Sequence, residues 1–374
     1  MGQTTSSAVT ASILLTTLLA PETSTVTSTL LASSSTLTVS PETASPTYTS
    51  SNSSLALFAN KNSPPAYTFR PGAQDNVAVY YGQSPSTKSG GLSTLCANPN
   101  VDIVILAFVN DFFHADGYPG VNFGPACDPP NAAQQVNAPG LLSCPNLGRE
   151  VQSCQKIGKP VLVSLGGWRA NTSFVSDAQA TQFAGTLWNL FGAGKQTPLL
   201  RPFGPDVVVD GFDIDNEDHS AAHYQAFATA LRAQFAKDEV KKYYLSAAPQ
   251  CPIPDESIPM SVMTQADFVW VQFYNNPSCN LNSVGFNSSF EQWSSMLAGS
   301  SYGQKPRVYI GTGAFAGAGS GYVAGNALRQ YVGQATSQGV GNMGGIMLWD
   351  GDSALANVDQ YERNYLQYAK AALR

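Results

Sequence analysis

The chain has 374 residues, which is enough for one large barrel or for two domains of ordinary size. Its formal net charge of −6 and its pI of about 5.0 argue against a nucleic acid or an anionic membrane surface as a partner. No apolar run is long enough to cross a membrane, so we expect no membrane span. A neutral substrate is compatible with this charge.

Residues 1–70 differ in composition from the rest of the chain. About half of residues 1–50 are serine or threonine, and Glu22 and Glu42 are the charged side chains of this stretch. Such a segment cannot bury enough apolar surface to offset the entropy lost on ordering. We therefore expect residues 1–70 to be a disordered Ser/Thr/Pro-rich segment of the kind that carries O-glycans. Residues 11–20 resemble the apolar part of a signal peptide, although no basic residue precedes them.

From residue 76 onward, short apolar runs alternate with helical or loop stretches. Most of these runs are continuously apolar, as expected when both faces of a parallel sheet are buried. We predict eight strands, at 77–81, 102–108, 160–165, 207–215, 243–248, 268–273, 307–311 and 345–349. The clearest amphipathic helices are predicted at 176–191, 220–237 and 358–373. The alternation predicts a (β/α)8 TIM barrel of the α/β class over residues 76–374. An open doubly wound sheet is less favoured, because no GxGxxG follows the first strand.

An acidic cluster ends the predicted strand 207–215. Because side chains alternate faces along a strand, Asp213, Asp215 and Glu217 project from one side. Three carboxyls so close cannot all ionise freely, so at least one pKa should be raised, as a general acid requires. A solvated surface run would not follow three valines. A magnesium or calcium site is the other alternative, but no second acidic cluster supplies further ligands.

Aromatic and amide side chains follow several of the other predicted strands. Barrel enzymes carry their chemistry at these carboxyl ends. Flat rings can cover the apolar faces of sugars, and amides can bond their hydroxyls, so the pattern favours a sugar substrate. Any single aromatic is more often a core residue, but several at different strand ends are harder to explain in that way. These residues include Tyr80, Gln83, Trp168, Gln250, Gln272, Tyr274, Asn275 and Trp349.

Two motifs resemble those of family 18 glycoside hydrolases. Residues 210–217, DGFDIDNE, resemble the DGxDxDxE signature, and residues 164–167, SLGG, resemble the SxGG motif. Residues 79–83, 247–252, 270–276 and 344–349 resemble plant and fungal class III chitinases in detail. The resemblance covers residues 76–374 and none of the Ser/Thr-rich segment. Two positions depart from the family pattern, because Tyr81 stands where tryptophan is common and Asn216 where an apolar residue is common.

The resemblance implies an endo-acting chitinase that uses substrate-assisted, retaining catalysis and is an exception to the two-carboxylate scheme. Glu217 would protonate the glycosidic oxygen, and Asp215 would orient the acetamido N–H of the substrate. Asp213 would hydrogen-bond Asp215 and share a proton with it. Tyr274 would donate to the acetamido oxygen, and Trp349 would form the floor of the cleaved sugar's subsite.

Further expectations follow from the same resemblance. It implies sugar contacts at Tyr80, Gln83, Phe108, Asn122, Gln272 and Asn275. The six cysteines, whose pairing the spacing leaves open, would pair as Cys96–Cys154, Cys127–Cys144 and Cys251–Cys279. We expect a secreted monomer that binds chitin or chitooligosaccharides, with Asn171 and Asn287 as candidate N-glycan sites. No zinc-type cluster of Cys and His is present in the sequence, and we expect no metal or other cofactor.

Three alternatives remain open. A non-catalytic lectin or inhibitor on the same barrel would typically lack the terminal acid, which is present here as Glu217. An endo-β-N-acetylglucosaminidase acting on N-glycans would need the same catalytic set. A structural wall protein would suit the Ser/Thr-rich segment but leaves the acidic cluster unexplained. The connection 312–343 is too short for an inserted domain, which predicts an open groove.

Overall fold

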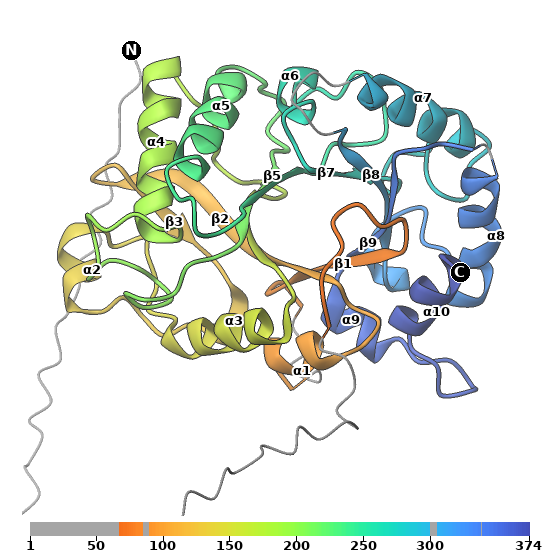
Figure 1. Ribbon diagram of the computed structural model, residues 1–374, viewed down its shortest axis with the longest axis horizontal. Coiled ribbons are helices and arrows are strands. Elements are labelled where there is room, and N and C mark those ends of the chain that lie inside the picture. The colour runs from red at the N-terminus through yellow and green to blue at the C-terminus, as the bar shows by residue number, and fades with distance from the viewer. Residues whose placement is uncertain (1–66, 85–89, 300–304, 338) are drawn as a thin grey trace, which may run out of the picture. The chain divides into compact units, whose positions relative to one another are not determined.

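A closed sheet ringed by helices forms the body of the protein (Figure 1). The computed structural model describes residues 67–84, 90–299, 305–337 and 339–374. The sheet order is β1-β9-β8-β7-β6-β5-β4-β2-β3, and β1 also pairs with β2, which closes the ring. All pairings are parallel except that of β3, which lies antiparallel beside β2. The predicted (β/α)8 barrel is confirmed.

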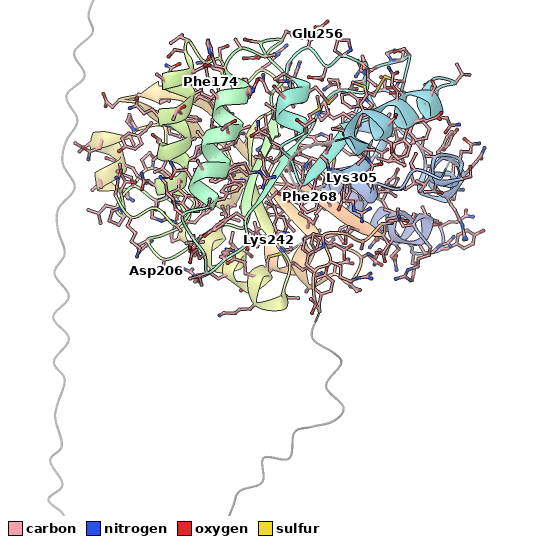
Figure 2. The ribbon with its side chains drawn as sticks, turned by 45° about the horizontal axis from the view of Figure 1, so that its top comes forward. Phe174, Asp206, Lys242, Glu256, Phe268 and Lys305 are labelled. Carbon is pink, nitrogen blue, oxygen red and sulfur yellow. A yellow bond between two sulfur atoms is a disulfide. The ribbon has the colours of Figure 1, made fainter. Side chains whose placement is uncertain are left out.

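Each predicted strand has a counterpart in the barrel. The parallel strands are β1 (Asn76–Tyr81), β2 (Ile103–Ala115), β4 (Val161–Gly166), β5 (Gly211–Asp215), β6 (Tyr244–Ala247), β7 (Phe268–Gln272), β8 (Arg307–Gly313) and β9 (Met343–Trp349). Their carboxyl ends share one rim of the barrel, since all run in the same direction. Figure 2 agrees with this polarity for β6, because Glu256 after the strand lies at the top of the view and Lys242 before the strand lies well below it.

The prediction of a strand from 207 is wrong over its first residues, because β5 begins at Gly211. The N–H of Val209 donates to the carbonyl of Phe191 at the end of the preceding helix rather than to a neighbouring strand. Val207 and Val209 are nevertheless buried. The β-branched apolar run before Gly211 therefore indicates burial but does not indicate pairing in a strand.

A hairpin that the apolar pattern does not predict extends β2. After Ala115 the chain turns at Asp116 and Gly117, both with positive φ, and returns as β3 (Tyr118–Val121). An Asp-Gly pair is a strong hairpin signal, because both turn positions favour residues that tolerate positive φ. The hairpin could therefore have been predicted from the sequence. The hairpin delivers Asn122 to the rim where the strands end.

The helices alternate with the strands and cover the outside of the ring (Figure 1). They are α1 (Leu92–Ala97), α2 (Ala132–Asn137), α3 (Pro145–Ile157), α4 (Asp177–Leu190), α5 (Tyr224–Phe235), α6 (Met260–Met263), α7 (Phe286–Ala298), α8 (Gly325–Thr336), α9 (Gly351–Ala356) and α10 (Tyr365–Ala372). The prediction for 176–191 is confirmed by α4. The predicted starts at 220 and 358 are too early: His223 before α5 has positive φ, and Asn364 forms the capping box of α10.

The core has two layers, one between sheet and helices and one inside the barrel. The inner layer includes Trp270 and Tyr309, whose rings meet edge to face. Phe69 packs edge-on against Tyr244 and Phe268 at the end of the barrel opposite the rim. The folded body therefore includes residues before 76, where the predicted catalytic domain begins. Residues 1–66 of the predicted Ser/Thr-rich segment lie outside the described residues.

Three disulfides join helices and loops around the barrel. They are Cys96–Cys154, Cys127–Cys144 and Cys251–Cys279, which confirms the expected pairing. In the described part of the chain, no helix has the length and apolar character needed to cross a membrane.

Candidate active site

Asp213 is the innermost member of the acidic cluster, and two neighbouring strands hold it. The register places Asp213 beside Ser164 of β4 and Ser246 of β6, and both hydroxyls donate to its carboxylate, at 2.7 and 2.6 Å. Tyr80 Oη and Trp270 Nε1 donate from across the barrel, both at 2.8 Å. Burial raises the pKa of Asp213, and these hydrogen bonds oppose that shift. The side chain is thereby fixed in one orientation.

Asp215 and Glu217 form a hydrogen-bonded pair at the end of β5. Gln272 Nε2 of β7 also donates to Asp215, at 3.0 Å. The pKa of Asp215 is raised well above its ordinary value, first by burial and then by the negative charges of Glu217 and Asp213. Burial also raises the pKa of Glu217. The pair therefore holds a proton at a pH where an exposed carboxyl would have lost it, as a general acid requires.

The resemblance implied a hydrogen bond between Asp213 and Asp215 with a shared proton. In the structure, Asp215 is instead hydrogen-bonded to Glu217 and Gln272. Four other donors surround the oxygens of Asp213, whereas Asp215 bonds to Glu217 and Gln272. In the conformation seen here, Asp215 thus faces the terminal acid. The charge of Asp213 still acts on Asp215, because it helps to raise the pKa of that carboxyl.

A hollow of about 480 Å³, here the first hollow, opens beside these acids at the rim. Tyr274 is one of its walls, and burial with the nearby negative charges raises the pKa of this hydroxyl, which stays protonated and can donate. Most of the predicted site residues line the hollow together. These are Gln83, Phe108, Asn122, Asp215, Glu217, Gln272, Tyr274, Asn275 and Trp349.

Tyr80 does not line the hollow, in contrast to its predicted sugar contact. Only 1% of Tyr80 is exposed, and its hydroxyl is bonded to Asp213. Its ring lies against Phe108 and against the edge of Trp349, and those two rings stack on each other with centroids 5.8 Å apart. Tyr80 therefore orients Asp213 and supports the aromatic floor from beneath. A strand-end pattern cannot separate these roles, because depth in the barrel depends on register.

Gln83 joins the first strand to the hairpin at the edge of the hollow. Its Nε2 donates to the carbonyls of Ala107, at 2.8 Å, and Asn122, at 2.9 Å.

The structure also adds residues that line the first hollow and that the resemblance did not name, chiefly Asn110 and Trp168. Trp168 follows the SLGG motif at a predicted strand end, so its position in the sequence was a usable signal.

A second hollow, of about 660 Å³, lies on the other side of Glu217. Trp168, Glu217 and Asn275 line both hollows, so the two adjoin each other at the terminal acid. Trp168 is 74% exposed, and the Arg169 guanidinium lies 4.1 Å from its ring centroid. The loop that follows β6 forms the outer wall, with Gln250, Pro252, Pro254, Asp255, Glu256 and Ser257. A chain laid along this cleft would pass Glu217 with sugar units on both sides.

Comparison with known proteins now agrees with the geometry. The family model of glycosyl hydrolases family 18 matches residues 76–312. The chain belongs to this family. "Endochitinase 3" of Metarhizium anisopliae is 40% identical over 284 residues, which are 75% of this chain and 93% of that relative. "Chitinase 3" of Candida albicans is 39% identical over 315 residues, 83% of this chain, but this family 18 chain spans only 53% of that longer protein.

Solved structures share the barrel. The ICChI chitinase from Ipomoea carnea superposes with a TM-score of 0.64 at 28% identity, over 79% of this chain and 99% of that one. The xylanase and alpha-amylase inhibitor protein XAIP-II from Scadoxus multiflorus also has a TM-score of 0.64, at 27% identity over 79% of this chain and 98% of that one. A protein with a similar barrel can thus be an inhibitor, so activity must be argued from the site.

Proposed function

We propose that this family 18 chain is an endo-acting chitinase that cleaves β-1,4 links between N-acetylglucosamine units. The observation that carries the proposal is the position of Glu217, which is hydrogen-bonded to Asp215 and lines two adjoining hollows. Relatives that are named endochitinases and are about 40% identical support the same activity. An acid between two sugar-sized hollows suits internal cleavage of a polymer.

The mechanism follows from the groups around the first hollow. The proton of the Asp215–Glu217 pair passes from Glu217 to the glycosidic oxygen as the bond from that oxygen to the anomeric carbon breaks. The acetamido carbonyl oxygen of the same sugar forms the new bond to that carbon and gives an oxazolinium ion. Asp215 accepts from the acetamido N–H and balances its positive charge, while Tyr274 donates to the acetamido oxygen. Glu217 then takes a proton from water, whose oxygen bonds to the anomeric carbon as the bond from that carbon to the acetamido oxygen breaks; the acetamide re-forms, and the configuration is retained overall.

The first hollow also suggests how the substrate is held. Phe108 and Trp349 provide a stacked aromatic surface on which the cleaved sugar can lie. Gln83, Asn122, Gln272 and Asn275 surround it with amides that can bond sugar hydroxyls or the acetamido group. A neutral polymer needs no charged side chain to bind its hydroxyls. The residues thus have the chemistry expected for chitin or chitooligosaccharides.

We further propose that the protein is a secreted monomer with two parts, a Ser/Thr-rich segment and the catalytic barrel. The three disulfides support an oxidising compartment. Of the two candidate N-glycan sites in the barrel, Asn171 is the better acceptor, because it is exposed at the rim. Asn287 lies in the first turn of α7, and its side-chain oxygen is buried.

The test compares hydrolysis of chitin oligomers by the wild type, Glu217→Gln and Glu291→Gln, which changes an exposed residue of α7. A neutral isostere keeps the shape of the site but cannot donate the proton. Glu217→Gln should therefore lose nearly all turnover, by about 10² to 10⁴-fold, and still bind oligomers. Glu291→Gln should match the wild type. A Glu217→Gln enzyme that keeps a tenth of the turnover would exclude Glu217 as the acid.

The same assay separates the alternatives. An inhibitor or lectin would bind oligomers without any hydrolysis by the wild type. An endo-β-N-acetylglucosaminidase would release N-glycans from a glycoprotein faster than it shortens chitin oligomers. The proposed chitinase should do the reverse.

A further inference from the structure

A buried asparagine lies between the two carboxyls of the pair. Asn216 follows Asp215 and precedes Glu217, and only 2% of it is exposed. Its side-chain oxygen accepts from the Thr172 hydroxyl, at 2.7 Å, and from the Asp218 N–H, at 3.4 Å. Its side-chain nitrogen donates to the carbonyls of Ser220 and Ser257, both at 2.9 Å. The amide thus uses both of its donors and both of its acceptor positions.

These contacts reach three separate loops around the cleft. Thr172 belongs to the loop after β4, Ser220 to the loop after β5, and Ser257 to the loop after β6. Ser257 is also part of the outer wall of the second hollow. A single side chain therefore ties the segment that carries Glu217 to the walls on both sides of it.

The backbone on the other side of this segment is held as well. The N–H of Gly167 donates to the carbonyl of Asp215, at 2.8 Å. Gly166 has positive φ, and a Cβ there would lie 2.1 Å from the same carbonyl oxygen. The peptide between Asp215 and Asn216 is thus closely packed against the SLGG motif. Held from both sides, it leaves the Glu217 backbone little freedom to shift.

We propose that Asn216 is a positioning residue that holds Glu217 in line with the glycosidic oxygen. The inference rests on the proposed function, since it concerns the same proton transfer. The backbone of Glu217 is joined to the barrel through the short segment after β5, because the strand ends at Asp215. An apolar residue at 216 would leave the carbonyls of Ser220 and Ser257 without these bonds in a buried site. The loops would separate, and the acid would lose its fixed position.

The test uses the dependence of the rate on the leaving group. A sugar leaving group needs the proton of Glu217, whereas a dinitrophenolate departs with little protonation. We therefore compare kcat/KM for a chitin oligomer and for the dinitrophenyl glycoside of the chitin disaccharide, because kcat/KM reports bond cleavage. Asn216→Leu should lower kcat/KM about 10²-fold for the oligomer but by less than about threefold for the dinitrophenyl glycoside.

Two further variants guard against a trivial loss of folded protein. Thr172→Val removes one donor to Asn216 and should show a smaller fall of the same leaving-group-dependent kind. Combined with Asn216→Leu, it should add little, because both act through one contact. Asn342→Leu is the matched control: it removes a buried asparagine that bonds to Ser294 and directly precedes β9, at the end of the barrel away from the rim. It should lower the melting temperature without changing the ratio of the two rates.

The outcomes separate this inference from the proposed function. A wild type that cleaves neither substrate would refute the proposed function itself. A wild type that cleaves both, with Asn216→Leu losing equal activity on the two substrates or none, would refute the positioning role alone. Should Asn216→Leu fail to fold, Thr172→Val decides the matter, because an unchanged ratio of rates in this variant would also refute the role.

Discussion

At the residue scale, the raised pKa values of the acidic cluster lower the stability of the fold at neutral pH. Burial raises the pKa of Asp213, Asp215 and Glu217 above the values they would have in the unfolded chain, and for Asp215 the negative charges of Glu217 and Asp213 add to this shift. The folded protein therefore binds more protons than the unfolded one. Stability contributed by such groups rises as the pH falls through the raised pKa values and levels off near the ordinary carboxyl pKa of about 4.

This linkage predicts the effect of neutralising one member. Asp215→Asn removes a buried carboxyl whose pKa is raised, so it should raise the melting temperature at pH 7 by roughly 1–2 °C, which corresponds to about 1 kcal/mol in a domain of about 300 residues. The gain should shrink as the pH falls and vanish near pH 4. Calorimetric scans between these values measure it, with Asp206→Asn at an exposed position as the control. A gain that is constant with pH would contradict the shifted pKa.

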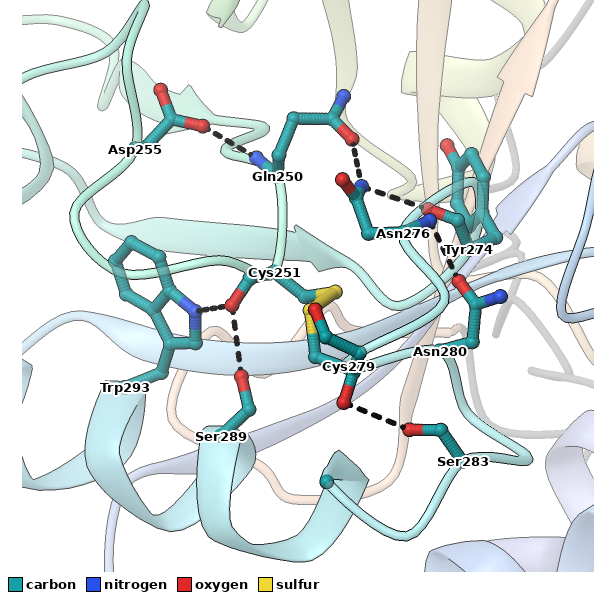
Figure 3. The surroundings of a disulfide bond; sticks show 12 residues. Gln250, Cys251, Asp255, Tyr274, Asn276, Cys279, Asn280, Ser283, Ser289 and Trp293 are labelled. Atoms are coloured by element: carbon teal, nitrogen blue, oxygen red, sulfur yellow. Dashed lines mark hydrogen bonds between the residues drawn. A yellow bond between two sulfur atoms is a disulfide. The ribbon is translucent and has the colours of Figure 1, made fainter.

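At the scale of elements, one disulfide joins the two loops that shape the second hollow (Figure 3). Cys251 follows β6, and Cys279 follows β7 beyond Tyr274. The Cys251 carbonyl also accepts from Ser289 and from Trp293 of α7, at 2.9 and 3.1 Å. Alongside the bridge, Asn276 Nδ2 donates to Gln250 at 2.6 Å. The loop that carries Tyr274 is thereby tied to the outer wall of the second hollow and to the helix beneath it.

Removal of this bridge should therefore affect catalysis as well as stability. A Cys251→Ser/Cys279→Ser variant should lose about 2–4 kcal/mol of stability. It should also turn over chitin oligomers more slowly at temperatures where it remains folded, because Tyr274 is less well held. The matched control is Cys96→Ser/Cys154→Ser, whose bridge links α1 to α3. The control should lose stability but keep its turnover, and equal turnover in both variants would contradict the positioning effect.

At the scale of the whole barrel, the connection between β8 and β9 adds no domain beside the cleft in its described part. The connection between β8 and β9 holds a short 3-10 turn, Ala316–Ala318, and the helix α8 in its described part. Neither is an inserted domain that could wall the cleft. A long polymer can thus lie across the rim, with sugar units in both hollows, and be cut within the chain.

The open cleft predicts the pattern of products. Soluble chitin derivatives should lose viscosity early and yield oligomers of mixed length, because entry does not require a free chain end. Chromatography of the first products and viscometry measure this. Accumulation of the disaccharide alone from the first turnovers would contradict the open-cleft prediction. The short β8–β9 connection can be read from the sequence, so this prediction needs little tertiary information.

The sequence by itself determined the barrel and the direction in which the acids point. Apolar runs at regular intervals indicated each parallel strand, since a buried strand must be apolar on both faces. The alternation of Asp213, Asp215 and Glu217 followed from the two-residue period of a strand. The disulfide pairing came from resemblance and not from spacing. Where local chemistry competed with pattern, the sequence was less informative, as at Val207 and Val209, which are buried without being part of a strand.

Only the tertiary structure decided which of these side chains meet and which partners they share. The resemblance placed Tyr80 in contact with sugar, but the register of β1 buries it beneath the floor, where it bonds to Asp213. Asn216 departs from the family pattern, and the resemblance implied no role for it. In the structure, its side-chain amide bonds to three loops. The physical reason is that a hydrogen bond requires two atoms within about 3 Å. Loops that lie some forty residues apart come that close only through the register and closure of the barrel.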